Sequence, residues 1–232
     1  MAFKKGKLLN IYTKDYVVFD LETTGLSPID DEIIEISGIK VRSGQALEEF
    51  TSLVNPNRPI PVAATNINGI TDDMVKEAPY MGSVLEQFLQ FIGNDILVGH
   101  NIHSFDMQFL YNGAARELHR EISNQYIDTL YLAKSCLPRL PRHRLTDIAA
   151  YFKIDIKGAH RALNDCNINL QCYEQLGRLL LANPGGTAEQ PVSSCPKCGG
   201  ILMKRKGKFG EFWGCGNFPQ CRYTMNISTG NL

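Results

Sequence analysis

The stretch that decides the fold lies near the N-terminus and reads Val17-Val18-Phe19-Asp20-Leu21-Glu22-Thr23-Thr24-Gly25-Leu26. Its first half is apolar and partly β-branched, which predicts a buried strand. Because successive side chains of a strand point to opposite faces, Asp20 and Glu22 fall on the same face. The Thr-Thr-Gly that follows predicts a turn. Two carboxylates on one face are suited to bind a cation. The alternative interpretation is that the end of the strand is acidic but has no function.

The length of the chain and the distribution of its charges indicate how many domains to expect and what they bind. The 232 residues suffice for one well-buried domain with a small appendix, or for two small domains. From Cys195 onward there are six basic residues and one acidic residue, whereas the first 194 residues carry a net charge of −5. This asymmetry favours metal chemistry in the acidic part and a polyanion partner for the basic part. No apolar run spans a bilayer and no signal peptide is recognisable, so we expect a soluble, cytoplasmic protein without a membrane partner.

The order of the elements indicates an α/β fold. Three strands at the start are joined by tight turns and are expected to be partly antiparallel, and βα units follow. The Pro-rich residues 55–61 form a loop, and Ser104 is expected to cap the helix that contains Asp106. The expected strands are residues 17–22, 32–42, 46–54, 96–101 and 126–128, and the expected helices are residues 81–92, 104–119, 129–136, 145–152 and 162–181.

Three later residues complete a pattern that begins with Asp20 and Glu22. Asp106 lies in the first turn of a helix, and His160 precedes Asp165 by five positions at the start of the last helix. Taken singly, Asp106 is explained by favourable helix electrostatics, His160 by a surface position and Asp165 by solvation. Together, the three blocks that contain these residues, 19–26, 99–106 and 160–165, resemble the DEDDh exonucleases, a family that includes the proofreading subunit of bacterial replicative polymerases. The resemblance covers about residues 14–180.

This resemblance implies an RNase H-like fold with a five-stranded mixed sheet flanked by helices. It also implies hydrolysis with two Mg²⁺ or Mn²⁺ ions, for which carboxylate oxygens are suitable ligands. The implied metal ligands are Asp20, Glu22, Asp106 and Asp165, and the implied general base is His160, because imidazole takes up a proton near neutral pH. Asn68 stands where relatives often carry His. The implied contacts to the 3′-terminal nucleotide are Thr23, Thr24, Leu26, Asn101 and Phe105.

Four of the seven cysteines cluster near the C-terminus with the spacing C-x2-C-x16-C-x5-C, namely Cys195, Cys198, Cys215 and Cys221. Four thiolates in two turns separated by a strand-forming stretch match a tetrahedral zinc site. A redox C-x-x-C is the competing interpretation, although it needs no second pair. We place a flexible linker at residues 183–194, between an exonuclease domain (residues 1–182) and a zinc-dependent domain (residues 195–232).

The segments around these cysteines resemble the C-terminal zinc ribbons of type IA topoisomerases, which bind single-stranded DNA. Basic side chains can follow the phosphates while aromatic rings stack on bases. The alternative is that the aromatic rings form the small core of the ribbon, and at least one of them is expected to point inward. The candidate DNA contacts are Lys204, Arg205, Lys206, Lys208, Phe209, Phe212 and Trp213.

The sequence therefore predicts a metal-dependent 3′–5′ exonuclease that releases nucleoside 5′-monophosphates from DNA, with a zinc ribbon that binds single-stranded DNA. Its partners would be DNA with a 3′ end and a DNA polymerase or a repair complex. Two alternatives stay open at this point. The carboxylate set also serves 3′–5′ exoribonucleases, and a non-catalytic, polymerase-associated subunit can retain the same fold.

Overall fold

The computed structural model describes residues 5–157, 160–182, 195–197, 202–207, 210–215, 218 and 221–226. The chain divides into two compact units, Met1–Ala182 and Asn183–Leu232. The predicted linker, residues 183–194, lies outside the described residues. Within the described parts of the chain, no helix combines the length and the apolar character that a membrane span requires.

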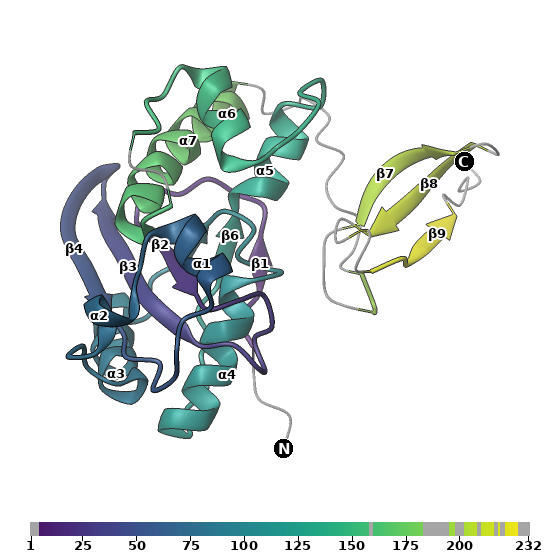
Figure 1. The fold of residues 1–232 in the computed structure, drawn as a ribbon. Coiled ribbons are helices and arrows are strands. Elements are labelled where there is room, and N and C mark those ends of the chain that lie inside the picture. The colour runs from purple at the N-terminus through teal and green to yellow at the C-terminus, as the bar shows by residue number, and fades with distance from the viewer. Residues whose placement is uncertain are drawn as a thin grey trace. The chain divides into compact units, whose positions relative to one another are not determined.

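The first unit is built on a six-stranded mixed sheet with the order β1-β6-β5-β2-β3-β4 (Figure 1). Strands β2, β3 and β4 are antiparallel neighbours, whereas β5 and β6 continue the sheet in parallel. This confirms the predicted mixed sheet and adds one strand to the expected five. The additional strand, β1, has two residues, which is too short to show a period of two in the sequence. The strands are β1 Leu8–Leu9, β2 Tyr16–Thr23, β3 Ile33–Arg42, β4 Gln45–Leu53, β5 Leu97–Gly99 and β6 Tyr126–Asp128.

Seven helices surround this sheet in the described part of the unit, and three of them differ from expectation. Helix α2 is not among the expected helices, and with four residues it is too short to show a helical period in the sequence. Helix α1 was not predicted, because it follows a Pro-rich loop directly. Helix α4 begins at Asp106 with Phe105 as its N-cap, so the prediction that Ser104 is the cap was wrong. The helices are α1 Val62–Asn68, α2 Asp72–Val75, α3 Met81–Ile92, α4 Asp106–Leu118, α5 Thr129–Cys136, α6 Leu145–Phe152 and α7 Ala162–Ala182.

The alternation of β2 divides its side chains between two apolar cores. Phe19 belongs to the core that α3 and α4 close, and Val18 belongs to the core that α5, α6 and α7 close. Asp20 has the same parity as Val18, so it faces the side of the sheet that α7 covers. The two-residue period that places Asp20 and Glu22 together therefore also directs them toward the last helix.

The second unit contains a three-stranded antiparallel sheet of β7 Leu202–Gly207, β8 Gly210–Cys215 and β9 Thr224–Asn226, in that order. Its small core consists of Leu202 and Trp213 together with three cysteines. So small a core contributes little apolar burial, and a further stabilising element is expected.

Candidate active site

Three of the predicted carboxylates converge at the end of β2. Asp20 and Glu22 project from β2, Asp165 projects from the first turn of α7, and one oxygen of each lies within 4.8 Å of the others. The side chain of Asp106 contacts the backbone of the same strand, because its Oδ1 accepts the N–H of Leu21 at 3.2 Å. Strand β5 pairs with β2 only at Val17 and Val18, so the N–H of Leu21 lies beyond that ladder.

This concentration of carboxylates makes ionisation unfavourable in the metal-free protein. Burial, followed by the charge of Asp106, raises the pKa of Asp20 well above its usual value. Burial and the charges of Asp165 and Glu35 raise the pKa of Glu22 to about 7. Burial also raises the pKa values of Asp106 and Asp165. A site with this electrostatic character has a strong affinity for cations.

The geometry fits a hard divalent cation. With ligand oxygens about 2.1 Å from Mg²⁺, neighbouring oxygens lie about 3 Å apart and opposite oxygens about 4 Å apart. The oxygens of Asp20, Glu22 and Asp165 lie within 4.8 Å of one another, so small side-chain rotations bring them to these separations. The all-oxygen donor set also matches the preference of Mg²⁺ and Mn²⁺.

His160 is exposed and lies two residues before α7, with a left-handed backbone (φ 69°). Its N–H donates to Oδ2 of Asp165 at 3.1 Å, so the backbone of the predicted base is tied to a predicted metal ligand. The exposed imidazole is free to reach a water molecule at the carboxylates.

An ion pair beside His160 links α7 to the sheet. The buried carboxylate of Glu35 accepts from Nε and NH2 of Arg161 at 3.2 and 2.7 Å and from the N–H of Ala162 at 3.0 Å. Glu35 lies opposite Glu22 in the β2–β3 ladder. Like charges in such a pair repel, and the guanidinium of Arg161 offsets that repulsion. Glu35 also satisfies a backbone N–H at the start of α7.

The turn after Glu22 is held by its own hydroxyl groups. Thr23 Oγ1 donates to the carbonyl of Gly25 at 2.6 Å, and Thr24 is buried with its Oγ1 donating to Asp31 Oδ1 at 3.2 Å. A Cβ at Gly25 would displace the carboxylate of Asp31, which accepts from Thr24, so a larger residue at this position would disturb the turn. Leu26 is 84% exposed, which is compatible with a contact to a nucleotide base.

The turn that precedes α4 is organised by Asp128. This buried carboxylate accepts the N–H groups of Asn101, His103 and Leu130 at 2.9, 3.0 and 3.0 Å. The turn leaves Asn101 exposed in a left-handed conformation, whereas Phe105 packs against Phe109 and the core below α4.

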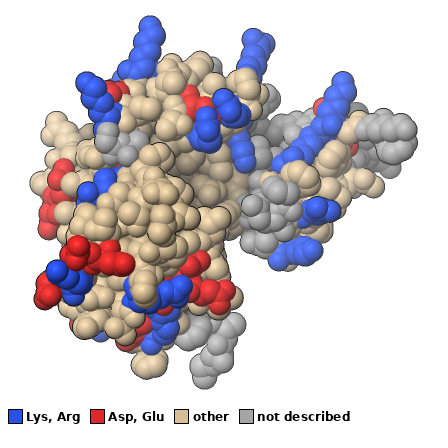
Figure 2. Space-filling view, in the orientation of Figure 1, with Lys and Arg blue, Asp and Glu red and all other residues tan. Residues whose placement is uncertain are grey.

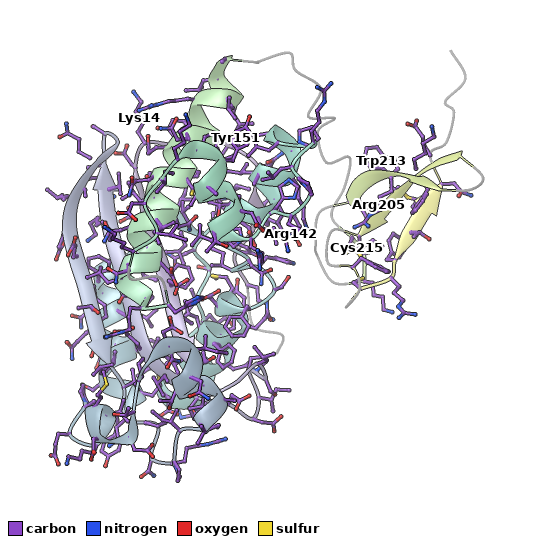
Figure 3. All side chains as sticks on the ribbon, turned by 45° about the horizontal axis from the view of Figure 1, so that its top comes forward. Lys14, Arg142, Tyr151, Arg205, Trp213 and Cys215 are labelled. Carbon is purple, nitrogen blue, oxygen red and sulfur yellow. The ribbon has the colours of Figure 1, made fainter. Side chains whose placement is uncertain are left out.

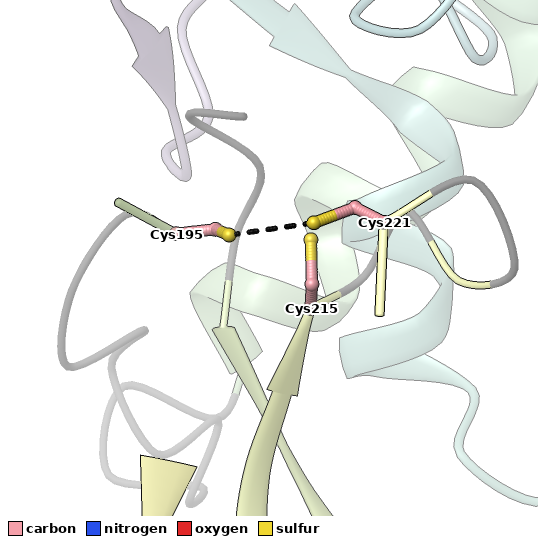
Figure 4. A group of neighbouring side chains, drawn as sticks. All are labelled: Cys195, Cys215 and Cys221. Atoms are coloured by element: carbon pink, nitrogen blue, oxygen red, sulfur yellow. Dashed lines mark hydrogen bonds between the residues drawn. The ribbon is translucent and has the colours of Figure 1, made fainter. Parts of the chain in front are cut away.

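In the second unit, the sulfur atoms of Cys195, Cys215 and Cys221 point toward one another (Figure 4). The Sγ atoms of Cys195 and Cys221 are 3.7 Å apart, too far for a disulfide bond. A tetrahedral zinc ion with Zn–S bonds of about 2.3 Å places its sulfur ligands about 3.8 Å apart. The three thiols therefore fit zinc. The fourth predicted ligand, Cys198, lies outside the described residues.

The predicted DNA contacts of the second unit occupy different environments. Trp213 is only 8% exposed and belongs to the small core, so its ring is not free to stack on a base. Phe212 is half-buried, and the guanidinium of Arg205 lies 5.7 Å from the ring of the exposed Phe218. Lys206 is exposed. The side chain of Lys204, and Lys208 and Phe209, lie outside the described residues.

Each of the two units matches a known protein family. Residues 17–173 match the protein family described as "Exonuclease". The chain belongs to the exonuclease family. Residues 192–229 match a second family, described as "Topoisomerase DNA binding C4 zinc finger".

Relatives of this exonuclease include PolC-type DNA polymerases III. The protein of Oceanobacillus iheyensis is 44% identical over 156 residues, which are 67% of this chain and 11% of that polymerase. The protein of Bacillus subtilis is 43% identical over 151 residues, 65% of this chain and 10% of that polymerase. The exonuclease therefore spans about a tenth of the length of these polymerases.

Among solved structures, exonuclease X in complex with 5′-overhanging duplex DNA has a TM-score of 0.58 and 28% identity, covering 75% of this chain and 96% of that one. Exonuclease I has a TM-score of 0.66, covering 90% of this chain and 54% of that one, and at 17% identity it shows a shared fold alone.

Two residues of the exonuclease site were not predicted as site residues. Glu35 interrupts the apolar run of β3, and a buried charge in such a run was the available signal. Asn68 was noted only as a departure from relatives. It is buried, its Oδ1 accepts the N–H of Ile70 at 3.0 Å, and its side chain hydrogen bonds to Glu22. Asn68 therefore orients a predicted metal ligand.

Proposed function

We propose that the chain is a metal-dependent 3′–5′ exonuclease that removes nucleoside 5′-monophosphates from single-stranded or frayed DNA ends. The observation that carries this proposal is the convergence of Asp20, Glu22 and Asp165 within 4.8 Å, next to an exposed histidine. The relatives named above are DNA polymerases, and one similar structure holds DNA, which favours DNA over RNA.

The chemistry follows from the residues at the end of β2. Asp20, Glu22, Asp106 and Asp165 would hold two Mg²⁺ or Mn²⁺ ions, which supply charge neutralisation at the phosphoryl oxygens and acidify water. Asn68 keeps the Glu22 carboxylate in place, and the backbone N–H of Leu21 keeps the Asp106 carboxylate in place.

His160 would take the proton from the attacking water. Its backbone is anchored to Asp165, while Arg161 and Glu35 hold the start of α7 against the sheet. These contacts leave the imidazole exposed, so it can move onto the water when a DNA end enters. Leu26, Thr23, Thr24, Asn101 and Phe105 would form the pocket of the terminal nucleotide.

The second unit would be a zinc ribbon that binds single-stranded DNA through Arg205, Lys206, Phe212 and Phe218, with Cys195, Cys198, Cys215 and Cys221 as zinc ligands. A DNA-binding module joined by a short linker raises the local concentration of DNA ends at the catalytic unit. Because the relatives are bacterial DNA polymerases, we further propose a cytoplasmic location and a DNA polymerase or a repair complex as partner.

The test is degradation of 5′-labelled single-stranded DNA and RNA of the same sequence with Mg²⁺ or Mn²⁺. The proteins compared are the wild type, Asp20→Asn and a chain that ends at Ala182. We expect a ladder that shortens from the 3′ end of DNA, is absent with Asp20→Asn, and becomes weaker and more sensitive to salt without the second unit.

Faster decay of RNA would replace this proposal with a 3′–5′ exoribonuclease. Absence of turnover on both polymers with both metals would leave a binding protein with a nuclease fold.

A further inference from the structure

A groove of about 560 Å³ is lined at one end by Asn101, a predicted contact of the terminal nucleotide. The loop between α5 and α6 forms one wall through Arg142, His143 and Arg144, the α5 side chain Lys134 contributes to the lining, and His100 and Asn101 close the end that leads to α4. Among the described residues that line it, none carries a carboxylate. The groove is therefore a positively charged surface next to a site that is itself strongly acidic.

The basic side chains of this groove differ in whether they are already paired with a carboxylate. Arg144 is paired with Asp147, since its Nε and NH2 donate to the carboxylate at 2.9 and 3.0 Å. Arg142 is exposed and forms no hydrogen bond or ion pair with the residues that the structure describes, although its charge attracts the Asp147 carboxylate at longer range. It extends from the loop after α5 (Figure 3). Arg142 is thus the side chain whose charge is most available to a ligand.

The groove is physically continuous with the catalytic elements. His100 Nδ1 lies 3.1 Å from Thr129 Oγ1, which donates to Asn169 Oδ1 at 2.8 Å. Asn169 lies one turn after Asp165 on α7. At the same end, Asn101 is fixed through its N–H to Asp128, in the turn that leads directly to Asp106. A DNA strand whose terminal nucleotide contacts Asn101 therefore lies next to the groove.

The protein surface around the groove is also positively charged (Figure 2). Figure 2 shows Lys and Arg side chains gathered over the end of the first unit that α5, α6 and α7 form, with few acidic side chains among them. Burial and then the charge of Lys134 lower the pKa of His100 to about 4. A neutral His100 beside Lys134 is suited to donate or accept a hydrogen bond at the groove wall.

We propose that this groove binds the phosphodiester backbone of the substrate strand on the 5′ side of the terminal nucleotide, with Arg142 as the principal phosphate contact. This inference rests on the proposed function. Its consequence is that the first unit holds several nucleotides of single-stranded substrate by itself, without reading their sequence, because guanidinium groups bind phosphates irrespective of the base.

The test compares two substrates that share the reacting phosphodiester. One is a 5′-labelled single-stranded oligonucleotide, and the other is the p-nitrophenyl ester of thymidine 5′-monophosphate, which has no upstream phosphate. The full chain is measured as wild type, Arg142→Ala, Arg142→Lys and the control Arg120→Ala. Arg120 is exposed and lies beyond the far end of α4, about 20 Å from Asp106 along the helix.

We expect Arg142→Ala to raise KM for the oligonucleotide about tenfold, and the loss to be at least about five times greater than the loss on the ester. Arg142→Lys should recover most of the affinity, and Arg120→Ala should behave as wild type. Binding of the same oligonucleotide to Asp20→Asn in EDTA, measured by fluorescence anisotropy, should show a salt dependence that is shallower by about 0.7 in log Kd per log salt when Arg142 is removed.

Equal losses on the two substrates would overturn the proposal, because they would indicate a structural role for Arg142. Unchanged KM and unchanged salt dependence would overturn it as well. An inactive wild type would refute the proposed function, whereas the anisotropy measurement would still decide whether the groove binds the strand.

Discussion

Replacement of Glu22 by glutamine should stabilise the metal-free protein while removing its activity. Burial, followed by the charges of Asp165 and of Glu35 across the β2–β3 ladder, raises the pKa of Glu22 from 4.5 to about 7. At 1.36 kcal/mol per pKa unit, ionised Glu22 costs the folded state about 3 kcal/mol at pH 8, and about 2 kcal/mol after allowance for its partial contact with solvent. Glutamine keeps the shape and the hydrogen-bonding capacity toward Asn68 but has no charge.

The sign of the pH dependence follows from the raised pKa. Below pH 4.5 the carboxyl group is protonated in both the folded and the unfolded chain, so it does not affect stability there. Between 4.5 and about 7 the folded protein retains a proton that the unfolded chain has lost, and stability falls as the pH rises through this window. The Glu22→Gln protein should not lose stability over this pH window, because glutamine does not ionise.

The assay is thermal unfolding in EDTA at pH 5 and pH 8. At pH 8 the variant should melt about 4–8 °C above wild type, and at pH 5 the difference should shrink to about 2 °C or less. Excess Mn²⁺ should raise the melting temperature of wild type more than that of the variant, because the variant has lost a ligand. Glu49→Gln, an exposed position on β4, is the matched control and should show no such pH dependence.

The reasoning would be refuted by a Glu22→Gln protein that is less stable than wild type in EDTA at pH 8. It would equally be refuted by a difference of the same size at both pH values, because that would indicate a packing effect rather than relief of the cost of ionising a buried carboxylate.

Three further predictions concern the supporting residues. Arg161→Ala leaves the buried Glu35 carboxylate with one backbone donor, so urea unfolding should show a loss of about 2–3 kcal/mol, and Arg161→Lys should restore only part of it because lysine cannot bind bidentately. Cys215→Ser should abolish zinc in metal analysis of the purified chain and weaken binding to single-stranded DNA, while hydrolysis of the p-nitrophenyl ester persists; full zinc occupancy would contradict the ligand assignment. Asp128→Asn replaces the acceptor of three backbone N–H groups and should cost about 2–4 kcal/mol in the same urea measurement, whereas a loss below about 1 kcal/mol would show that the turn before α4 is held by other contacts.

Much of the site could be predicted because its signals are local. The period of two in β2 placed Asp20 and Glu22 on one face, and helix α3 was predicted with the boundaries that the structure shows. Of the four cysteines that the spacing indicated, the three that the structure describes come together. Family resemblance supplied the remaining partners, Asp106, His160 and Asp165, for which the local sequence offers only ordinary explanations.

The tertiary structure decided what depends on the pairing of distant segments. The ladder register sets Glu35 against Glu22, and the packing of α7 on the sheet brings Arg161 to that buried carboxylate. Strand register and the choice of a buried ion-pair partner depend on contacts between residues far apart in sequence, so neither has a local signature. The same holds for the basic groove beside Asn101, whose walls come from the β5–α4 turn and the α5–α6 loop. The sequence by itself determined which residue types the chemistry uses, and only the folded chain determined what holds them and where a strand can lie.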